Sequence, residues 1–417
     1  MTKASRQAIA GINSGNRVES VDVLDIVLKS VEVCNIACTY CYYYFSGDDS
    51  WKTRPKYLPI STAQDIANWI GAAVRDLDVK SVSITFHGGE PLLMKPHLFS
   101  ELCGLFQDMA NENGVHQSFA IQTNGMLVSS EWIDLFAEFD VSVGVSIDGP
   151  KQYHDLYRVD KQGKGTLLRV EAGLVKLVEA ADAGRIKPPG LLAVINPDFD
   201  YSAVYNYFRG LGIVWMDFLL PAISYEDENY QSTLDGVYKA QRDVFRSWVS
   251  EDNPEVYVRF IDSLLSFFGN NVTRHKVETP EFASSVGVAV ISVGSNGDLG
   301  VREEIFATGW PQKFEVRSIY SVEARDLLNS APFKDVLIAA DLIPDKCFDC
   351  EFVGWCRGGE LKNRYSSDNL FNNRSIFCQG LKELYTEIVG YLSTNGYPAD
   401  AIRKKLSSAN SQAQGRV

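Results

Sequence analysis

Short apolar runs alternate with longer amphipathic segments between about residues 23 and 220. The apolar runs predict strands at residues 23–31, 81–86, 119–123, 141–147, 190–195 and 215–220. Segments between them, such as 61–77 and 96–112, carry apolar residues at helical spacing. This alternation is typical of βαβ units with a parallel sheet, closed or partly closed into a barrel. In such folds the chemistry gathers at the carboxyl ends of the strands.

The alternation of apolar runs and amphipathic segments ends at about residue 225. Residues 233–251 and 257–269 have helical patterns, and residues 288–305 predict a hairpin because Asn296-Gly297-Asp298 is a turn signal between apolar runs. An amphipathic helix follows at about 380–393, and the polar end of the chain predicts disorder. We therefore divide the chain into the segments 1–20 (tail), 21–225 (barrel), 226–280 (helical bridge), 281–395 (second domain) and 396–417 (polar tail).

The overall composition narrows the function classes. The 417 residues are 45% hydrophobic, and we find neither a secretion signal nor an apolar run long enough to cross a bilayer, so we expect a cytoplasmic protein without a membrane partner. The formal net charge of −13 argues against a nucleic-acid partner, because such proteins usually carry a basic stripe for phosphates.

The cysteines are the informative part of the composition. Three of the eight lie at 34–41, four lie at 347–378, and only Cys103 stands alone, on the apolar face of a predicted helix. The cytosol keeps thiols reduced, so disulfides are not expected. Two groups of cysteines predict two metal sites.

The first group is Cys34, Cys38 and Cys41, directly after a predicted strand. Three thiolates in one loop can bind three irons of a [4Fe–4S] cube and leave the fourth iron open for a ligand. A zinc knuckle or buried structural cysteines are the plainer alternatives for this spacing.

This spacing, completed by Tyr40, resembles the Cys-x-x-x-Cys-x-aromatic-Cys signature of the radical S-adenosylmethionine (radical SAM) superfamily. The resemblance implies a [4Fe–4S] cluster that reductively cleaves S-adenosylmethionine. It also implies an α/β fold: a partial (β/α)6 TIM-like barrel, with a C-terminal auxiliary-cluster domain of the SPASM or twitch type.

The resemblance implies roles for further residues at strand ends. Gly88, Gly89 and Glu90 would meet the amino group of S-adenosylmethionine, with glycine needed where the backbone approaches the ligand. Thr123 or Asn124, together with Ser146, would face the ribose or the carboxylate. The guanidinium of Arg158 would pair with the methionine carboxylate. Ile195 would make an apolar contact to the adenine. Each has a plainer alternative as a turn, surface or core residue.

The second group consists of Cys347, Cys350, Cys356 and Cys378. Four thiolates fully ligate one [4Fe–4S] cluster, which would then move electrons or shape a pocket. A four-cysteine zinc site has compatible spacing. The stretch resembles the carboxy-terminal half of a SPASM domain.

A complete SPASM pattern has seven cysteines, and three are missing from this chain. Glu360 and Arg302 stand at two of the vacant places, and the predicted hairpin has no cysteine. We therefore expect two [4Fe–4S] clusters in all. The resemblance places Glu303 where sulfatase maturases carry an aspartate base, so Glu303 is a candidate general base; a solvated hairpin carboxylate is the plainer alternative.

The truncated SPASM pattern and the stretch 148–158 resemble maturases of ribosomally made peptides, particularly those that crosslink an aromatic ring to a β-carbon and form a cyclophane. The implied partners are a precursor peptide with its leader and a reductant of the flavodoxin or ferredoxin type. Thioether formation, epimerisation and sulfatase maturation to formylglycine use the same first step and stay open. A non-catalytic peptide-binding barrel is the alternative from another class.

Overall fold

Seven parallel strands form the main body of the sheet. The computed structural model describes residues 18–45, 49–269, 287–306 and 317–414. Within these ranges one sheet has ten strands in the order β10-β9-β8-β1-β2-β3-β4-β5-β6-β7. The parallel strands that follow one another are β1 (Val23–Val31), β2 (Ser81–Gly88), β3 (His116–Thr123), β4 (Ser142–Ser146), β5 (Gly190–Val194), β6 (Trp215–Leu219) and β7 (Tyr257–Val258). The partial barrel predicted from the sequence is confirmed, with its six predicted strands at β1–β6.

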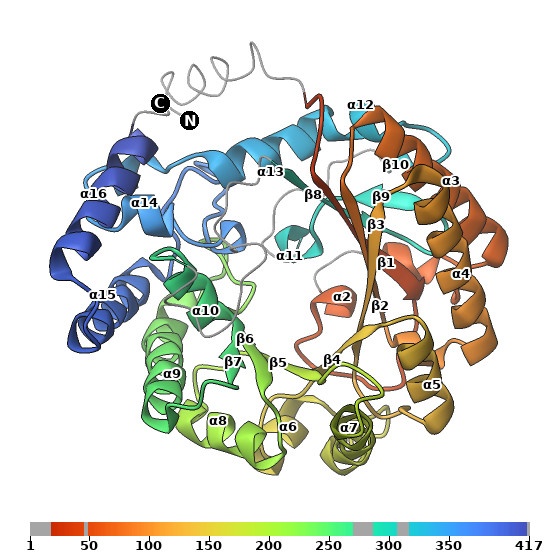
Figure 1. The fold of residues 1–417 in the computed structure, drawn as a ribbon, viewed down its shortest axis with the longest axis horizontal. Coiled ribbons are helices and arrows are strands. Elements are labelled where there is room, and N and C mark those ends of the chain that lie inside the picture. Colours follow the sequence, from red (N-terminus) through yellow and green to blue (C-terminus); the bar gives the residue numbers. More distant parts are fainter. Residues whose placement is uncertain (1–17, 46–48, 270–286, 307–316, 415–417) are drawn as a thin grey trace.

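Helices cover the outer face of this curved sheet (Figure 1). They are α3 (Ile60–Asp76), α4 (Pro96–Asn113), α5 (Ser130–Glu138), α6 (Lys151–Tyr157), α7 (Leu167–Asp182), α8 (Tyr201–Gly210), α9 (Tyr230–Glu251) and α10 (Arg259–Ser266). The alternation of apolar and polar residues along the strands explains which face of the sheet the helices cover. In β1, Leu24, Ile26 and Leu28 are fully buried, whereas Asp25 between them lies in the electrostatic field of Arg302 and Glu304 on the inner side. The outer face is thus the apolar core, and polar side chains point inward.

The predicted hairpin continues the same sheet. Strands β8 (Val288–Val293) and β9 (Asp298–Gly300) are antiparallel, and Gly297 in the turn has φ +85°, a value that glycine tolerates and most residues do not. Strand β8 also pairs in parallel with β1, and β10 (Arg317–Ser318) pairs with β9. The hairpin that the sequence places in the second domain is therefore joined to the barrel by backbone hydrogen bonds.

Four C-terminal helices close the ring opposite the strands, whereas α12 (Ala324–Leu328) packs beside α3 (Figure 1). The four are α13 (Ala331–Asp341), α14 (Val353–Cys356), α15 (Cys378–Thr394) and α16 (Ala399–Gln414), and the short α2 (Tyr42–Phe45) and α11 (Glu303–Phe306) lie toward the centre. Three 3₁₀ segments also matter below: η2 (Pro91–Leu93), η4 (Asp345–Cys347) and η5 (Leu361–Asn363).

The sequence predicts disorder for the polar residues 407–417, and this prediction is wrong for residues 407–414, which lie in α16 (Ala399–Gln414). This helix packs on α14, where a Cβ on Gly354 would collide with Ala409. Its inner face buries Ile402 and Ala413, and Asn410 accepts a hydrogen bond from the Gly354 amide at 2.8 Å. Three small or apolar contacts are enough to dock a helix whose average composition is polar, which a composition argument overlooks.

Candidate functional site

The first cysteine group lies in one loop at the carboxyl end of β1. The Ala37 amide donates to the Val159 carbonyl at 2.7 Å, and the Thr39 amide donates to the Tyr157 carbonyl at 3.0 Å. These bonds attach the loop between the cysteines to the chain that follows α6. The loop is therefore shaped by the protein itself rather than only by a ligand.

The thiols of this loop are poorly placed to ionise unaided. Burial raises the pKa of Cys34 to about 12. It also raises the pKa of Cys38, although the Arg158 cation opposes this effect. A buried thiol becomes a thiolate readily when a metal replaces its proton, because the metal supplies the missing positive charge. The loop thus suits an iron cluster that binds Cys34, Cys38 and Cys41.

Gly88 and Gly89 lie against the chain that leads into this loop. The Gly89 amide donates to the Val31 carbonyl at 2.7 Å. A Cβ on Gly88 would collide with the Val31 carbonyl, and one on Gly89 would collide with the Val33 carbonyl. Gly88 also has φ +122°, in the region that favours glycine. Both positions therefore require glycine, because the two backbone segments are in close contact.

Glu90 joins the ends of two strands. Its carboxylate is 1% exposed. Oε1 accepts hydrogen bonds from the Leu92 amide in η2 at 3.0 Å and from Thr123 Oγ1 at 2.6 Å, and Oε2 accepts one from the Asn124 amide at 2.7 Å. Burial raises the pKa of Glu90, while these donors oppose the rise. Thr123 and Asn124 are themselves buried, so the three residues hold β2 and β3 together beside the cysteine loop.

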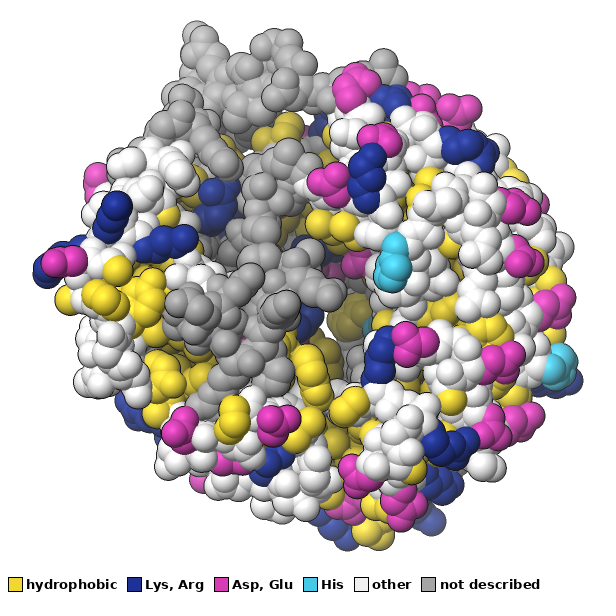
Figure 2. Space-filling view, in the orientation of Figure 1, with side chains coloured by type: hydrophobic (Ala, Val, Ile, Leu, Met, Phe, Trp, Pro, Cys, Tyr) yellow, Lys and Arg dark blue, Asp and Glu magenta, His cyan; other side chains and the backbone are white. Residues whose placement is uncertain are grey.

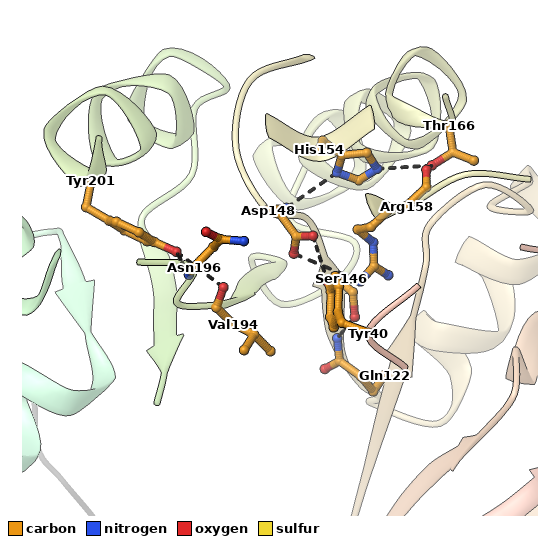
Figure 3. Close-up of polar contacts among 10 residues, drawn as sticks. All are labelled: Tyr40, Gln122, Ser146, Asp148, His154, Arg158, Thr166, Val194, Asn196 and Tyr201. Atoms are coloured by element: carbon orange, nitrogen blue, oxygen red, sulfur yellow. Dashed lines mark hydrogen bonds and ion pairs between the residues drawn. The ribbon is translucent and has the colours of Figure 1, made fainter. Parts of the chain in front are cut away.

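Figure 3 shows Tyr40, Asp148 and Arg158 meeting at the end of β4. Tyr40 Oη donates to Asp148 Oδ2 at 2.6 Å and accepts from Arg158 Nη1 at 2.8 Å. Burial would lower the pKa of Arg158, but Tyr40 and Asp148 outweigh it and raise the pKa. Within the described part of the chain, the buried Arg158 Nε has no hydrogen-bond partner. A fixed guanidinium with an orphaned donor suits a bound carboxylate.

His154 holds the backbone of this arginine (Figure 3). The Asp148 amide lies 3.4 Å from His154 Nδ1, and His154 Nε2 lies 3.1 Å from Thr166 Oγ1, which donates to the Arg158 carbonyl at 2.6 Å. Burial, followed by the Arg158 cation, lowers the pKa of His154 to about 3, so the ring is neutral and donates through Nε2. Sequence reasoning noted the stretch 148–158 but gave neither Asp148 nor His154 a role.

A cavity with about 1060 Å³ of empty space opens beside Tyr40 and Cys41. Its lining is mostly aromatic and apolar: Tyr40, Cys41, Tyr42, Phe45, Asp148, Tyr157, Val194, Ile195, Asn196, Pro197, Phe199, Pro221, Ala222 and Ile223. Ile195 thus lies in the cavity wall, whereas the hydroxyl of Ser146 accepts a hydrogen bond from Gln122 Nε2 at 2.8 Å. Figure 2 shows the molecule hollowed near its centre, with hydrophobic side chains in the opening.

A buried lysine lies next to this region, and the sequence analysis assigned it no role. Lys29 is 1% exposed; its Nζ lies 3.1 Å from His87 Nδ1 and 4.6 Å from the centre of the Tyr43 ring. Burial and the lysine charge lower the pKa of His87. Tyr43 in turn hydrogen-bonds the buried Glu32 carboxylate. The available signal was a lysine and a histidine near the ends of neighbouring parallel strands.

The four cysteines of the second group surround one small pocket of about 430 Å³ of empty space. Cys347 ends η4, Cys356 ends α14, and Cys378 begins α15. Burial raises the pKa of Cys347 to about 11 and that of Cys356 to about 12. A zinc ion needs its four sulfurs at about 2.3 Å from one point, whereas a four-iron cube binds each cysteine through a separate iron. Four thiols that line one pocket are compatible with the cube.

In the described ranges, no group of three or more His, Cys, Asp or Glu side chains is arranged to hold a single metal ion. None of the helices in these ranges is long and apolar enough to span a membrane.

The candidate base Glu303 is the first residue of α11, and its side chain lies outside the described residues. Its surroundings carry paired charges. Arg302 Nε lies 2.6 Å from Glu304 Oε1, and Lys362 Nζ lies 2.8 Å from Glu360 Oε2. Burial would raise the pKa of Glu304, but Arg302 and Lys362 hold it below its usual value. Arg302 and Glu360, which the resemblance to SPASM domains would put at missing cysteine positions, thus belong to neighbouring ion pairs.

Comparison with known proteins identifies a domain within this chain. Residues 28–182 match the model of the radical SAM superfamily. The chain carries a radical SAM domain. It is an enzyme, and its cofactors are S-adenosylmethionine and [4Fe–4S] clusters, one of them auxiliary.

The similarity to curated relatives extends over nearly the whole chain. The serine-type anaerobic sulfatase-maturating enzyme of Bacteroides thetaiotaomicron is 26% identical over 424 residues, which cover 94% of both chains. The cysteine-type anaerobic sulfatase-maturating enzyme of Clostridium perfringens (strain 13 / Type A) is 24% identical and matches 84% of this chain and 92% of its own.

Solved structures show the same fold. The structure of anSMEcpe with bound AdoMet superposes with a TM-score of 0.73 at 21% identity, covering 89% of this chain and 98% of that one. Streptococcus suis SuiB bound to its precursor peptide SuiA gives a TM-score of 0.52 at 16% identity, covering 90% and 79%. The radical SAM α/β fold expected from the sequence is thereby confirmed.

Proposed function

We propose that this radical SAM enzyme modifies a side chain within a ribosomally made peptide. The observation that carries the proposal is the match to a serine-type sulfatase-maturating enzyme over 94% of both chains. The cavity beside Cys41 supports it, because its mostly apolar and aromatic lining suits an apolar part of a substrate next to the cysteine loop.

The residues of the first site would have different roles. Cys34, Cys38 and Cys41 would hold the cluster with one iron open, and Arg158 would bind the carboxylate of S-adenosylmethionine through its unpaired Nε edge. Ile195 would pack on the adenine. When bound, these cofactors supply a 5′-deoxyadenosyl radical that removes a hydrogen atom from carbon.

The wall of the cavity would hold the peptide and exclude water. Tyr42, Phe45 and Pro197 line it, and Phe45 is 66% exposed, so an apolar ring is available to a substrate side chain. Water exclusion matters because a carbon radical must meet only its intended partner. The substrate residues near the cluster should accordingly be apolar or aromatic.

The finer proposal is a carbon–carbon crosslink between an aromatic ring and the β-carbon of a nearby residue. Hydrogen abstraction leaves a β-carbon radical, which adds to the ring. Rearomatisation then releases one proton and one electron. Glu303 is the proposed proton acceptor, and the auxiliary cluster at Cys347, Cys350, Cys356 and Cys378 is the proposed electron acceptor. The peptide loses two hydrogens in total.

Oxidation of a serine side chain to an aldehyde is the second candidate, and the names of the curated relatives favour it. Abstraction at the same β-carbon, followed by loss of the hydroxyl proton and one electron, also removes two hydrogens. The two candidates therefore differ in the product's structure and not in its mass.

The test uses the reconstituted enzyme with two peptides, in turn: an aromatic-containing peptide encoded by any short reading frame beside its gene and a serine-containing sulfatase peptide. A 2 Da loss with crosslinked fragments in tandem mass spectra supports the cyclophane; a 2 Da loss with hydrazide labelling supports the aldehyde. A variant with Cys34, Cys38 and Cys41 changed to Ala is the control. Cleavage of S-adenosylmethionine without change to either peptide contradicts both candidates.

Two partners are part of the proposal. The precursor would carry a leader that binds the barrel or the second domain, and a flavodoxin- or ferredoxin-type protein would supply electrons. The structure of SuiB with its precursor peptide SuiA supports the first partner through its shared fold. Binding of leader-deleted and full-length precursors to the enzyme, measured by calorimetry, tests this partner; equal affinities would contradict it.

A further inference from the structure

Asn124 lies at the end of β3, between Glu90 and the cysteine loop. Its Nδ2 lies 2.7 Å from Asn35 Oδ1 and 3.9 Å from Cys34 Sγ, within hydrogen-bonding reach of a sulfur atom. A side-chain amide has two N–H donors, so one can bind Asn35 while the other faces the sulfur. The residue is only 4% exposed.

The orientation of this amide is fixed by its partners. Asn124 Oδ1 accepts a hydrogen bond from the Met126 amide at 3.1 Å, and the Asn124 backbone amide donates to Glu90 Oε2 at 2.7 Å. An oxygen is required opposite the Met126 N–H, so the NH2 group must face Asn35 and Cys34. The side chain cannot turn without losing its bonds to Asn35 and Met126.

This geometry differs from the role that the resemblance implies. Asn124 does not line the cavity that Ile195 and Asp148 share, and both ends of its amide already have protein partners. Among the candidate cluster ligands, its side-chain amide contacts the sulfur of Cys34. The residue is therefore better placed to act on the cluster than on the ribose.

We propose that Asn124 is a positioning residue for the first [4Fe–4S] cluster, which donates an N–H···S hydrogen bond to Cys34 and raises the reduction potential of the cluster. Reduction adds a negative charge that is spread over the sulfurs. A donor to a ligand sulfur stabilises the reduced state more than the oxidised state, so the cluster accepts an electron more readily. Glu90 contributes by fixing the backbone of Asn124.

The experiment is an EPR-monitored redox titration of the reconstituted full-length enzyme without peptide. The first cluster is the one whose signal changes when S-adenosylmethionine is added. Asn124→Leu keeps the size and removes the donor; Asn124→Asp keeps the acceptor for Met126 and removes the donor. At the wild-type midpoint, we expect the ratio of reduced to oxidised first cluster to fall about 2- to 10-fold in Asn124→Leu, the effect of one hydrogen bond, and further in Asn124→Asp because of its charge.

Asn113→Leu is the matched control, because it removes an asparagine side-chain donor, here to the Met109 carbonyl at the end of α4, and leaves the donor to Cys34 in place. Iron analysis restricts the comparison to fully loaded protein. Unchanged midpoints in both Asn124 variants, or an equal shift in Asn113→Leu, overturn the proposal; so does failure of both Asn124 variants to hold the cluster, which makes Asn124 structural. Because no peptide is present, the result is independent of the proposed peptide modification.

Discussion

The two cysteine groups differ in what surrounds them. The first is a three-cysteine loop beside a cavity with about 1060 Å³ of empty space, with Arg158 and Asp148 close by. The second has four cysteines around about 430 Å³, enclosed by the C-terminal helices. The first group has one cysteine fewer than a four-iron cluster has irons, and it lies beside the larger space. The second group has a cysteine for every iron and the smaller space. The contrast is that expected between a cluster that binds a cosubstrate and one that only accepts or passes electrons.

The largest predicted effect separates the two groups directly. Changing Cys34, Cys38 and Cys41 to Ala should abolish 5′-deoxyadenosine formation and leave the second cluster loaded. Changing Cys347, Cys350 and Cys378 to Ala should retain cleavage of S-adenosylmethionine and abolish the peptide product. Iron content, 5′-deoxyadenosine and product are measured on each variant. Loss of cleavage in the second variant, with its first cluster intact by EPR, would remove the distinction.

A smaller effect should be confined to the first group. Arg158→Lys keeps the charge and loses the planar fork, so the Kd of S-adenosylmethionine should rise about 10- to 100-fold, the size of a charge-assisted hydrogen bond. Isothermal calorimetry on the reconstituted enzyme measures it. Arg169→Lys is the control, because Arg169 pairs with Asp160 at the surface. An affinity unchanged in Arg158→Lys would move the carboxylate site elsewhere.

A comparable perturbation should be confined to the second group. Gly354→Ala places a Cβ against the backbone of Ala409 in α16, and overpacking of this kind costs about 1–3 kcal/mol of unfolding free energy. Because Ala413 on the same helix packs with Cys347, the second cluster should be lost on mild chelation while the first is retained. The matched variant is Gly104→Ala in α4, where a Cβ meets nothing within 4 Å. Equal iron loss in both variants would refute the link.

The last effect, which is smallest at neutral pH and grows in acid, concerns the pH dependence of stability near the first group. The pKa of His154 is about 3 in the folded protein, below the unfolded value near 6.5. The unfolded chain therefore binds the extra proton between pH 6.5 and 3, so the contribution is complete above pH 6.5 and falls as the pH drops, by up to about 1.4 kcal/mol per unit. Denaturant unfolding of wild type and His154→Gln should show a shallower acid slope in the variant. Parallel slopes would contradict a neutral buried ring.

Much of the barrel was predictable because its signals are local. Apolar runs located β1–β6, and Asn296-Gly297-Asp298 located the hairpin turn. The parallel pairing of β8 with β1 was not predictable, because no local pattern specifies which edge a hairpin joins. The helix α16 was missed because its docking depends on Gly354, far away in the chain.

In the candidate site too, local sequence signals were predictable and long-range contacts were not. Cysteine spacing predicted both groups, and the structure brings the residues of each group together. The network of Tyr40, Asp148 and Arg158 joins residues more than a hundred positions apart, and the roles of His154 and Lys29 depend on which atoms face them. Sequence spacing carries no such information, so partners of buried polar groups had to come from the fold.

The pairing of β8 with β1 also has a consequence for biosynthesis. One edge of β1 (Val23–Val31) has its partner only in β8 (Val288–Val293), so this edge stays unpaired while most of the chain emerges from the ribosome. Unpaired edges invite aggregation, and inward-pointing charges such as Asp25 and Lys29 are a known protection. Nascent chains that stop before residue 288 should accordingly require chaperones.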